Sequence, residues 1–103
     1  MNFNLNYEGF EDYLVEKKPM NSGVHYVFRF ENGYGASVVK GPHTYGGPQD
    51  LWELAVIEFF GERSMNYELD YDTEITDDVC GYETDDGIRE LLVRIKALEN
   101  PDK

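Results

Sequence analysis

Carboxylates are the side chains in this sequence that most readily suggest chemistry. Five of them lie close together: Asp70, Asp72, Glu74, Asp77 and Asp78. Oxygen ligands at the first, third and fifth positions are typical of a calcium-binding loop. The rest of the pattern does not fit, because an EF-hand loop needs glycine where the chain has Ile75 and glutamate where it has Gly81. We therefore predict no metal site here.

Candidate nucleophiles and bases are few. His25, His43 and Cys80 could in principle form a zinc site or a nucleophile with its base, but zinc sites usually contain closely spaced Cys or His pairs, and the sequence has none. The glycine-rich stretch Gly41–Gly47 lacks the lysine of a phosphate-binding loop. We predict no catalytic, metal-binding or cofactor-binding residue, and no enzyme. The alternative, a small enzyme or ligand-binding protein, would need a deep pocket lined by His43, Tyr45 and Trp52.

The acidic residues are concentrated in one part of the chain. Of the formal net charge of −12, residues 66–90 carry −9. In a strand, Glu68, Asp70 and Asp72 would lie on one face, and alternate side chains are about 7 Å apart. By our estimate, neighbouring phosphates along one nucleic-acid strand are also about 7 Å apart, although the axial repeat is ~3.4 Å. The alternative is a solvated acidic face without a partner.

This concentration predicts a surface that binds a basic partner. We expect it to comprise Glu68, Asp70, Asp72, Asp77 and Asp78, with Asp85 and Asp86 nearby. Tyrosine and tryptophan are common interface anchors, and Tyr34, Tyr45 and Trp52 surround the glycine-rich stretch. These three aromatic residues are candidate anchors, with the alternative that they only cover an edge of the core.

The elements that position these residues follow from hydrophobic periodicity. Alternation predicts strands at 24–30 and 34–40, joined by a type I′ turn at Asn32-Gly33. It also predicts a strand at 65–72, with its apolar residues on one face and its carboxylates on the other. Residues 51–60 fit either a strand or a helix, and we favour the strand because the run that follows would complete a second hairpin.

The last element is an amphipathic helix. Thr84 is a good N-cap, Asp85 and Asp86 suit a first turn, and apolar residues repeat at helical spacing from Ile88 to Leu98. Phe3, Leu5 and Tyr7 alternate, as do Tyr13 and Val15, which predicts one or two short N-terminal strands. The sequence therefore predicts a single α+β domain, residues 1–103, in which a twisted antiparallel sheet of four to six strands packs against one C-terminal helix.

Composition excludes several classes of protein. The excess of 21 acidic over 9 basic residues argues against binding nucleic acid or an anionic membrane directly. No apolar run is long enough to span a bilayer, and the first 20 residues do not resemble a secretory leader. The single cysteine cannot form an internal disulfide. We expect a cytoplasmic protein, monomeric or homodimeric.

Four stretches carry a resemblance to a known group of proteins. They are Asn32–Val39, Leu51–Val56, Asp70–Thr73 and Ile75–Val79. Over about two-thirds of its length the chain resembles small uncharacterised acidic proteins of tailed bacteriophages and prophages. The resemblance implies a phage origin and a host-cell location, and it assigns no role to any residue. Phage genomes encode many short acidic inhibitors of host factors, including anti-restriction and anti-CRISPR proteins that imitate nucleic acid.

Together these features favour a non-enzymatic, phage-derived protein whose acidic surface engages a basic site on a host protein, such as a nucleic-acid-binding site of a defence protein. The alternative is a structural or assembly module, either a homodimer joined along a sheet edge or a minor virion component. Exposed apolar residues on the strand at 51–60 would favour this alternative.

Overall fold

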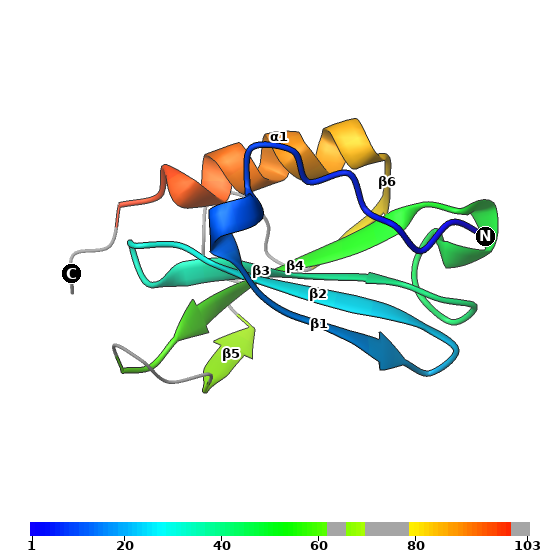
Figure 1. Ribbon diagram of the computed structural model, residues 1–103, viewed down its shortest axis with the longest axis horizontal. Coiled ribbons are helices and arrows are strands. Elements are labelled where there is room, and N and C mark those ends of the chain that lie inside the picture. The colour runs from blue at the N-terminus through cyan, green and yellow to red at the C-terminus, as the bar shows by residue number, and fades with distance from the viewer. Residues whose placement is uncertain (62–65, 70–78, 100–103) are drawn as a thin grey trace.

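The computed structural model describes residues 1–61, 66–69 and 79–99. Within these ranges the chain is α+β, as predicted: a six-stranded antiparallel sheet, which does not close into a barrel, packs against one C-terminal helix (Figure 1). The strands are β1 Leu14–Met20, β2 Gly23–Arg29, β3 Tyr34–Lys40, β4 Trp52–Phe59, β5 Tyr67–Leu69 and β6 Cys80–Glu83. The helix is α1 Asp85–Lys96, and 3₁₀ turns occur at Glu11–Tyr13 and Gly47–Gln49.

Two tight hairpins build the first three strands. The turn between β1 and β2 is Asn21-Ser22, and both residues have positive φ (44° and 66°), as a type I′ turn requires. The sequence predicted that turn type at Asn32-Gly33, between β2 and β3. The hairpin is confirmed, but the predicted turn type is wrong. A type I′ turn needs positive φ at both residues, whereas Gly33 has positive φ (87°) and Asn32 does not. The N–H of Gly33 donates to the carbonyl of Phe30 (3.1 Å).

The region 51–60 is a strand, as favoured from the sequence, and the helix alternative is wrong. Trp52, Leu54–Ile57 and Phe59 are buried. A near-continuous buried run of this kind is typical of a strand with both faces covered, which explains why its periodicity was ambiguous. The adjacent hairpin is confirmed for the part described, since β5 pairs antiparallel with β4.

β5 and β6 pair with the same edge of β4. Leu69 of β5 lies opposite Ile57, and Cys80 of β6 lies opposite Leu54. A continuous partner strand would need two residues to connect these positions, whereas the chain has ten, 70–79. The chain therefore has eight more residues between these two pairs than a continuous partner strand would need.

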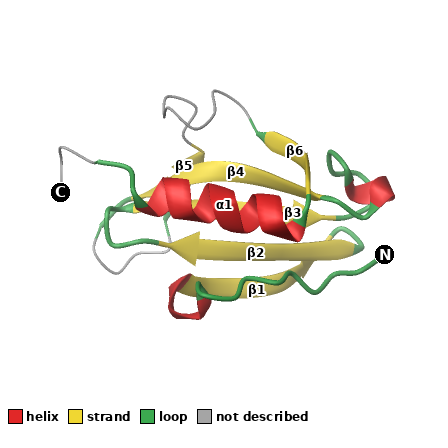
Figure 2. Cartoon of the chain, turned by 90° about the horizontal axis from the view of Figure 1, so that it is seen from above, coloured by secondary structure: helices red, strands yellow, loops and turns green. Residues whose placement is uncertain are grey.

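Apolar side chains form clusters on both faces of the sheet. The larger cluster includes Tyr26, Trp52, Ile88 and Leu92, and it lies between the sheet and α1. The smaller cluster, on the other face, consists of Val27, Ile57 and Phe59, with the ring of Tyr67 packed against it. The predicted helix therefore covers one face only (Figure 2).

Residues 1–10 run beside α1 on the same face of the sheet (Figure 2). Of the predicted N-terminal strands, the alternation that includes Val15 falls at the start of β1, whereas a strand at Phe3–Tyr7 is wrong, because this segment bonds to side chains rather than to a neighbouring strand. The N–H of Leu5 donates to the hydroxyl of Tyr26 (3.2 Å), which donates to the carbonyl of Phe3 (2.9 Å). Leu5 and Phe10 are buried, so the alternation reflects a segment that lies extended on the core.

Side chains bond to the backbone at both ends of α1. Thr84 is the N-cap, and its hydroxyl oxygen accepts from the N–H of Gly87 (3.1 Å), as predicted. At the other end the Asn32 amide donates to the carbonyls of Ile95 (2.9 Å), Lys96 (3.2 Å) and Leu98 (3.0 Å). The β2–β3 loop thus supplies donors that the last helical turn lacks.

Candidate binding surface

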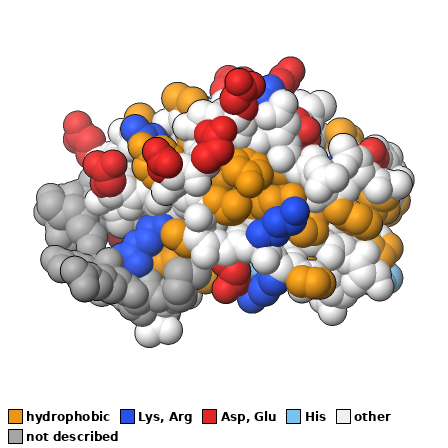
Figure 3. Space-filling view, viewed as in Figure 1, with side chains coloured by type: hydrophobic (Ala, Val, Ile, Leu, Met, Phe, Trp, Pro, Cys, Tyr) orange, Lys and Arg blue, Asp and Glu red, His pale blue; other side chains and the backbone are white. Residues whose placement is uncertain are grey.

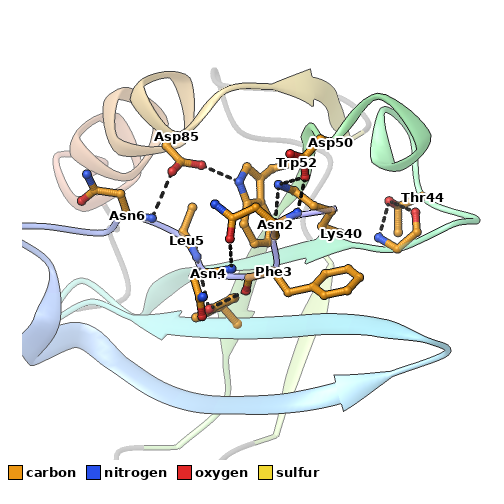
Figure 4. A network of polar contacts seen from close by, with 12 residues as sticks. Asn2, Phe3, Asn4, Leu5, Asn6, Lys40, Thr44, Asp50, Trp52 and Asp85 are labelled. Atoms are coloured by element: carbon orange, nitrogen blue, oxygen red, sulfur yellow. Dashed lines mark hydrogen bonds and ion pairs between the residues drawn. The ribbon is translucent and has the colours of Figure 1, made fainter.

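The two aspartates that begin α1 have different environments. Asp86 is 87% exposed at its side chain and pairs with Arg89 one turn later. Asp85 is half-buried, and its Oδ1 accepts a hydrogen bond of 2.6 Å from the indole N–H of Trp52 (Figure 4). Its Oδ2 accepts from the backbone N–H of Asn6 (3.3 Å). Asp86 is therefore available to a partner, whereas Asp85 joins the helix, β4 and the N-terminal segment.

A second polar contact ties the N-terminal segment to the sheet. The Lys40 side chain is 3% exposed, and its ammonium lies 4.2 Å from the centre of a Trp52 ring and donates to Asp50 Oδ1 (2.9 Å) and to the carbonyl of Asn2 (2.7 Å). The N–H of Asn2 donates to the same Asp50 oxygen (2.7 Å; Figure 4). The bond from Lys40 and then that from Asn2 lower the pKa of Asp50.

The predicted aromatic anchors differ in exposure. Trp52 is 1% exposed and cannot reach a partner, so its prediction as an anchor is wrong. Tyr34 is half-buried against the larger cluster. Tyr45 is 62% exposed and stays a candidate. Sequence reasoning missed Tyr82, which is 61% exposed and whose N–H donates to the carbonyl of Tyr45 (3.2 Å). Only the pairing of β6 with β4 brings these two tyrosines together.

Most of the predicted acidic surface falls on residues 70–78. Asp70, Asp72, Asp77 and Asp78 lie outside the described residues. Glu68 is exposed on β5 and pairs with Glu58 of β4, which places two carboxylates opposite each other on neighbouring strands. The described residues on either side of the acidic run are held by the pairing at Leu69 and at Cys80. Glu68, Asp85 and Asp86 are therefore the members of the predicted surface that the structure describes.

Next to Asp86, the described chain has further acidic side chains that the sequence analysis did not single out. Glu8, Glu11 and Asp12 are exposed on the N-terminal segment, and Asp86 and Glu90 are exposed on the neighbouring α1. Figure 3 shows acidic side chains gathered over these two elements. We call Glu8, Glu11 and Asp12 the N-terminal acidic group. Changing the charge of this group serves below as the control for changing the charge of Glu68, Asp70 and Asp72.

The candidate catalytic groups do not meet. His25 is buried on the sheet face opposite α1 and shares a hydrogen bond with the hydroxyl of Ser37 (Nε2 to Oγ, 2.7 Å), whereas His43 is exposed in the β3–β4 connection. Burial lowers the pKa of His25, Lys18 lowers it further, and Glu16 opposes the shift. Cys80 is half-buried and packs against the larger cluster.

No group of three metal-ligating side chains occurs within the described ranges. The pocket imagined around His43, Tyr45 and Trp52 is not formed, because Trp52 is buried while the other two residues are exposed. A hollow of about 420 Å³ lies elsewhere, between the N-terminal segment and the end of α1, and is lined by Phe10, Tyr13, Val93 and Lys96 among others. None of the candidate catalytic residues lines it.

Comparison of the chain with protein-family models, with curated proteins and with solved structures finds no match. Among the described residues, no helix has the length and apolar character needed to cross a membrane.

Proposed function

We propose that this chain is a non-enzymatic, phage-derived binding protein whose acidic surface occupies a basic site on a host protein. The observation that carries the proposal is the concentration of its charge in one part of the chain. Residues 66–90 hold a net charge of −9, and the described residues that flank 70–78 are fixed to one edge of β4 by pairing at Leu69 and Cys80. A concentrated charge can recognise a basic partner, rather than only raise solubility.

The acidic surface of the proposal is a revision of the predicted one. It keeps Glu68, Asp70, Asp72, Asp77, Asp78 and Asp86. It leaves out Asp85, because both oxygens of that carboxylate accept hydrogen bonds from within the fold. The partner class that suits a row of carboxylates is a protein whose basic site normally binds phosphates. Complementary charge would chiefly raise the rate of association, and exposed aromatic residues would slow dissociation.

The described surfaces give less support to the assembly alternative. The apolar residues of β4 are buried, and within the stretch 51–60 named for this alternative Phe60 is 47% exposed, so the expected apolar exposure is limited to the end of the stretch. The edge strand β1 carries Lys17, Lys18 and Pro19. Lysine and proline on an edge strand oppose pairing with another sheet, which disfavours a homodimer joined at this edge.

Affinity capture from a bacterial lysate tests the proposal. The bait is compared with a variant in which Glu68, Asp70 and Asp72 become lysine, and with a control in which the N-terminal acidic group becomes lysine. Both variants change the net charge equally. We expect the wild type and the control to retain the same basic protein and the 68–72 variant to lose it. Equal loss from both variants, or no specific partner in any capture, would contradict the proposal.

A further inference from the structure

Tyr45 and Tyr82 form an exposed pair at the end of the sheet where β6 lies against the β3–β4 connection. Their exposed fractions, 62% and 61%, are the highest among the large hydrophobic side chains of the described residues. A hydrogen bond joins their backbones (3.2 Å), and Tyr45 N–H also donates to Glu53 Oε1 (2.9 Å). Neither phenolic hydroxyl has a hydrogen-bond partner within the described ranges.

The two segments that carry the tyrosines are in close contact. A methyl group on Gly81 would lie 2.7 Å from Tyr45 Cβ, and one on Gly46 would lie 2.8 Å from Tyr82 Cα. Real Cβ atoms do not approach other atoms so closely, so both positions need glycine. The contact between the two segments therefore depends on a glycine in each.

Tyr82 also adopts a strained backbone conformation. Its φ is +59°, which is unusual for a bulky residue. The pairing of β6 with β4 is irregular here, because Trp52 is opposite Glu83 while Leu54 is opposite Cys80. Such bulges commonly redirect a side chain. Strain at an exposed aromatic residue that adds little to the core indicates a role outside stability.

The surroundings of the pair are acidic. Residues 41–53 and 79–86 contain five acidic residues, of which Asp50 pairs with Lys40, Asp86 pairs with Arg89, and Asp85 accepts hydrogen bonds from within the fold. One of the five, Glu53, bonds directly to the backbone of Tyr45, and another, Glu83, follows Tyr82 in the chain. Tyrosine faces attract cations, and the free hydroxyls can accept hydrogen bonds from them. The acidic neighbours and the tyrosine rings thus both favour a cation that donates hydrogen bonds.

We infer that Tyr45 and Tyr82 form a docking site for an arginine side chain of the partner protein. The inference rests on the proposed function and names the chemical group that the aromatic site takes. Arginine suits this site better than lysine because its planar guanidinium stacks on aromatic rings and presents several donors at once.

A peptide titration tests the inference without knowledge of the partner. The probes are three short peptides in which glycine alternates with arginine, lysine or glutamate, and the readout is the amide shifts of the ¹⁵N-labelled full chain. We expect the arginine peptide to shift Tyr45, Gly46, Gly81 and Tyr82, the lysine peptide to bind more weakly, and the glutamate peptide not to bind. Tyr45→Ala and Tyr82→Ala should each weaken arginine-peptide binding at least fivefold.

The control variant is Phe60→Ala, which removes an exposed aromatic side chain at the far end of β4 and should leave the peptide affinity unchanged. Tyr82→Gly separates function from folding, since it removes both the ring and the strain. We expect it to lose peptide binding with a melting temperature at least equal to that of the wild type.

Shifts that map elsewhere and persist in the tyrosine variants would overturn the inference while leaving the acidic surface as the binding element. Absence of arginine-peptide binding would also overturn it. Captured partners that bind the tyrosine variants normally but not the 68–72 variant would refute this site and not the proposed function.

Discussion

Replacing Asp85 by alanine should destabilise the protein far more than the same change at the neighbouring Asp86. Both carboxylates lie in the first turn of α1, where each gains about 0.3–1 kcal/mol from the helix dipole. Asp85 alone accepts a hydrogen bond from the buried indole of Trp52 (2.6 Å). Leaving that N–H unpaired costs a further ~1–3 kcal/mol.

These terms predict a loss of about 3 kcal/mol in the free energy of unfolding for Asp85→Ala. Asp86→Ala removes the dipole term and an exposed ion pair with Arg89, which together are worth about 1 kcal/mol or less. In a domain of this size, 1 kcal/mol shifts the melting temperature by roughly 4–8 °C, so the two variants should differ clearly. Asp85→Asn keeps an acceptor oxygen and should cost about 1 kcal/mol, mostly from the lost charge.

Equilibrium unfolding in urea, followed by far-ultraviolet circular dichroism, measures these changes. Trp52→Phe removes the indole N–H, so adding Asp85→Ala to that background should cost about 1 kcal/mol, well below its cost in the wild type. The reasoning is refuted if the two aspartate variants lose equal stability, or if the effect of Asp85→Ala is the same with and without the indole.

Three other residues give further expectations. Because the pKa of His25 is lowered in the folded chain, the unfolded chain binds more protons than the folded chain just below about pH 6.5, and the melting temperature should rise with pH up to that value. His25→Gln should flatten this dependence, whereas His43→Gln should not. Asn32→Asp should cost about 2 kcal/mol in urea melts, because it replaces a donor to the last carbonyls of α1 with a negative charge, and a loss below that of Asn32→Ala would contradict this. Gly81→Ala should separate the two tyrosine segments and abolish the amide shift changes caused by the arginine peptide, and retention of those changes would refute the close-approach argument.

Most of the fold could be predicted from periodicity and turn residues. Alternation around Tyr26 and around Val38, and the helical spacing after Thr84, identified β2, β3 and α1 because each element has one face on the larger cluster. β4 was harder, since a strand buried on both faces has little alternation. The turn at Asn32-Gly33 was assigned the wrong type because the side chain of Asn32 bonds to α1, a contact that no local pattern contains.

The candidate site was less predictable, because it depends on long-range contacts. Asp85 has the sequence signature of an exposed first-turn acid, yet its carboxylate accepts from Trp52, which is 33 residues away. Tyr82 had no sequence signal of its own, because its exposure follows from the irregular pairing between β6 and β4. The concentration of charge in residues 66–90, in contrast, is a property of the sequence and needed no fold to be recognised.

The most direct test of the central claim is the association rate constant of the captured partner, measured as a function of salt. If the proposed acidic surface guides binding, the rate for the wild type should fall steeply between about 50 mM and about 500 mM salt, as electrostatic screening increases. Converting Glu68, Asp70 and Asp72 to lysine should lower the rate at low salt and remove most of its salt dependence, whereas converting the N-terminal acidic group should preserve most of both. Equal effects of the two changes would show that only net charge matters and would contradict the account.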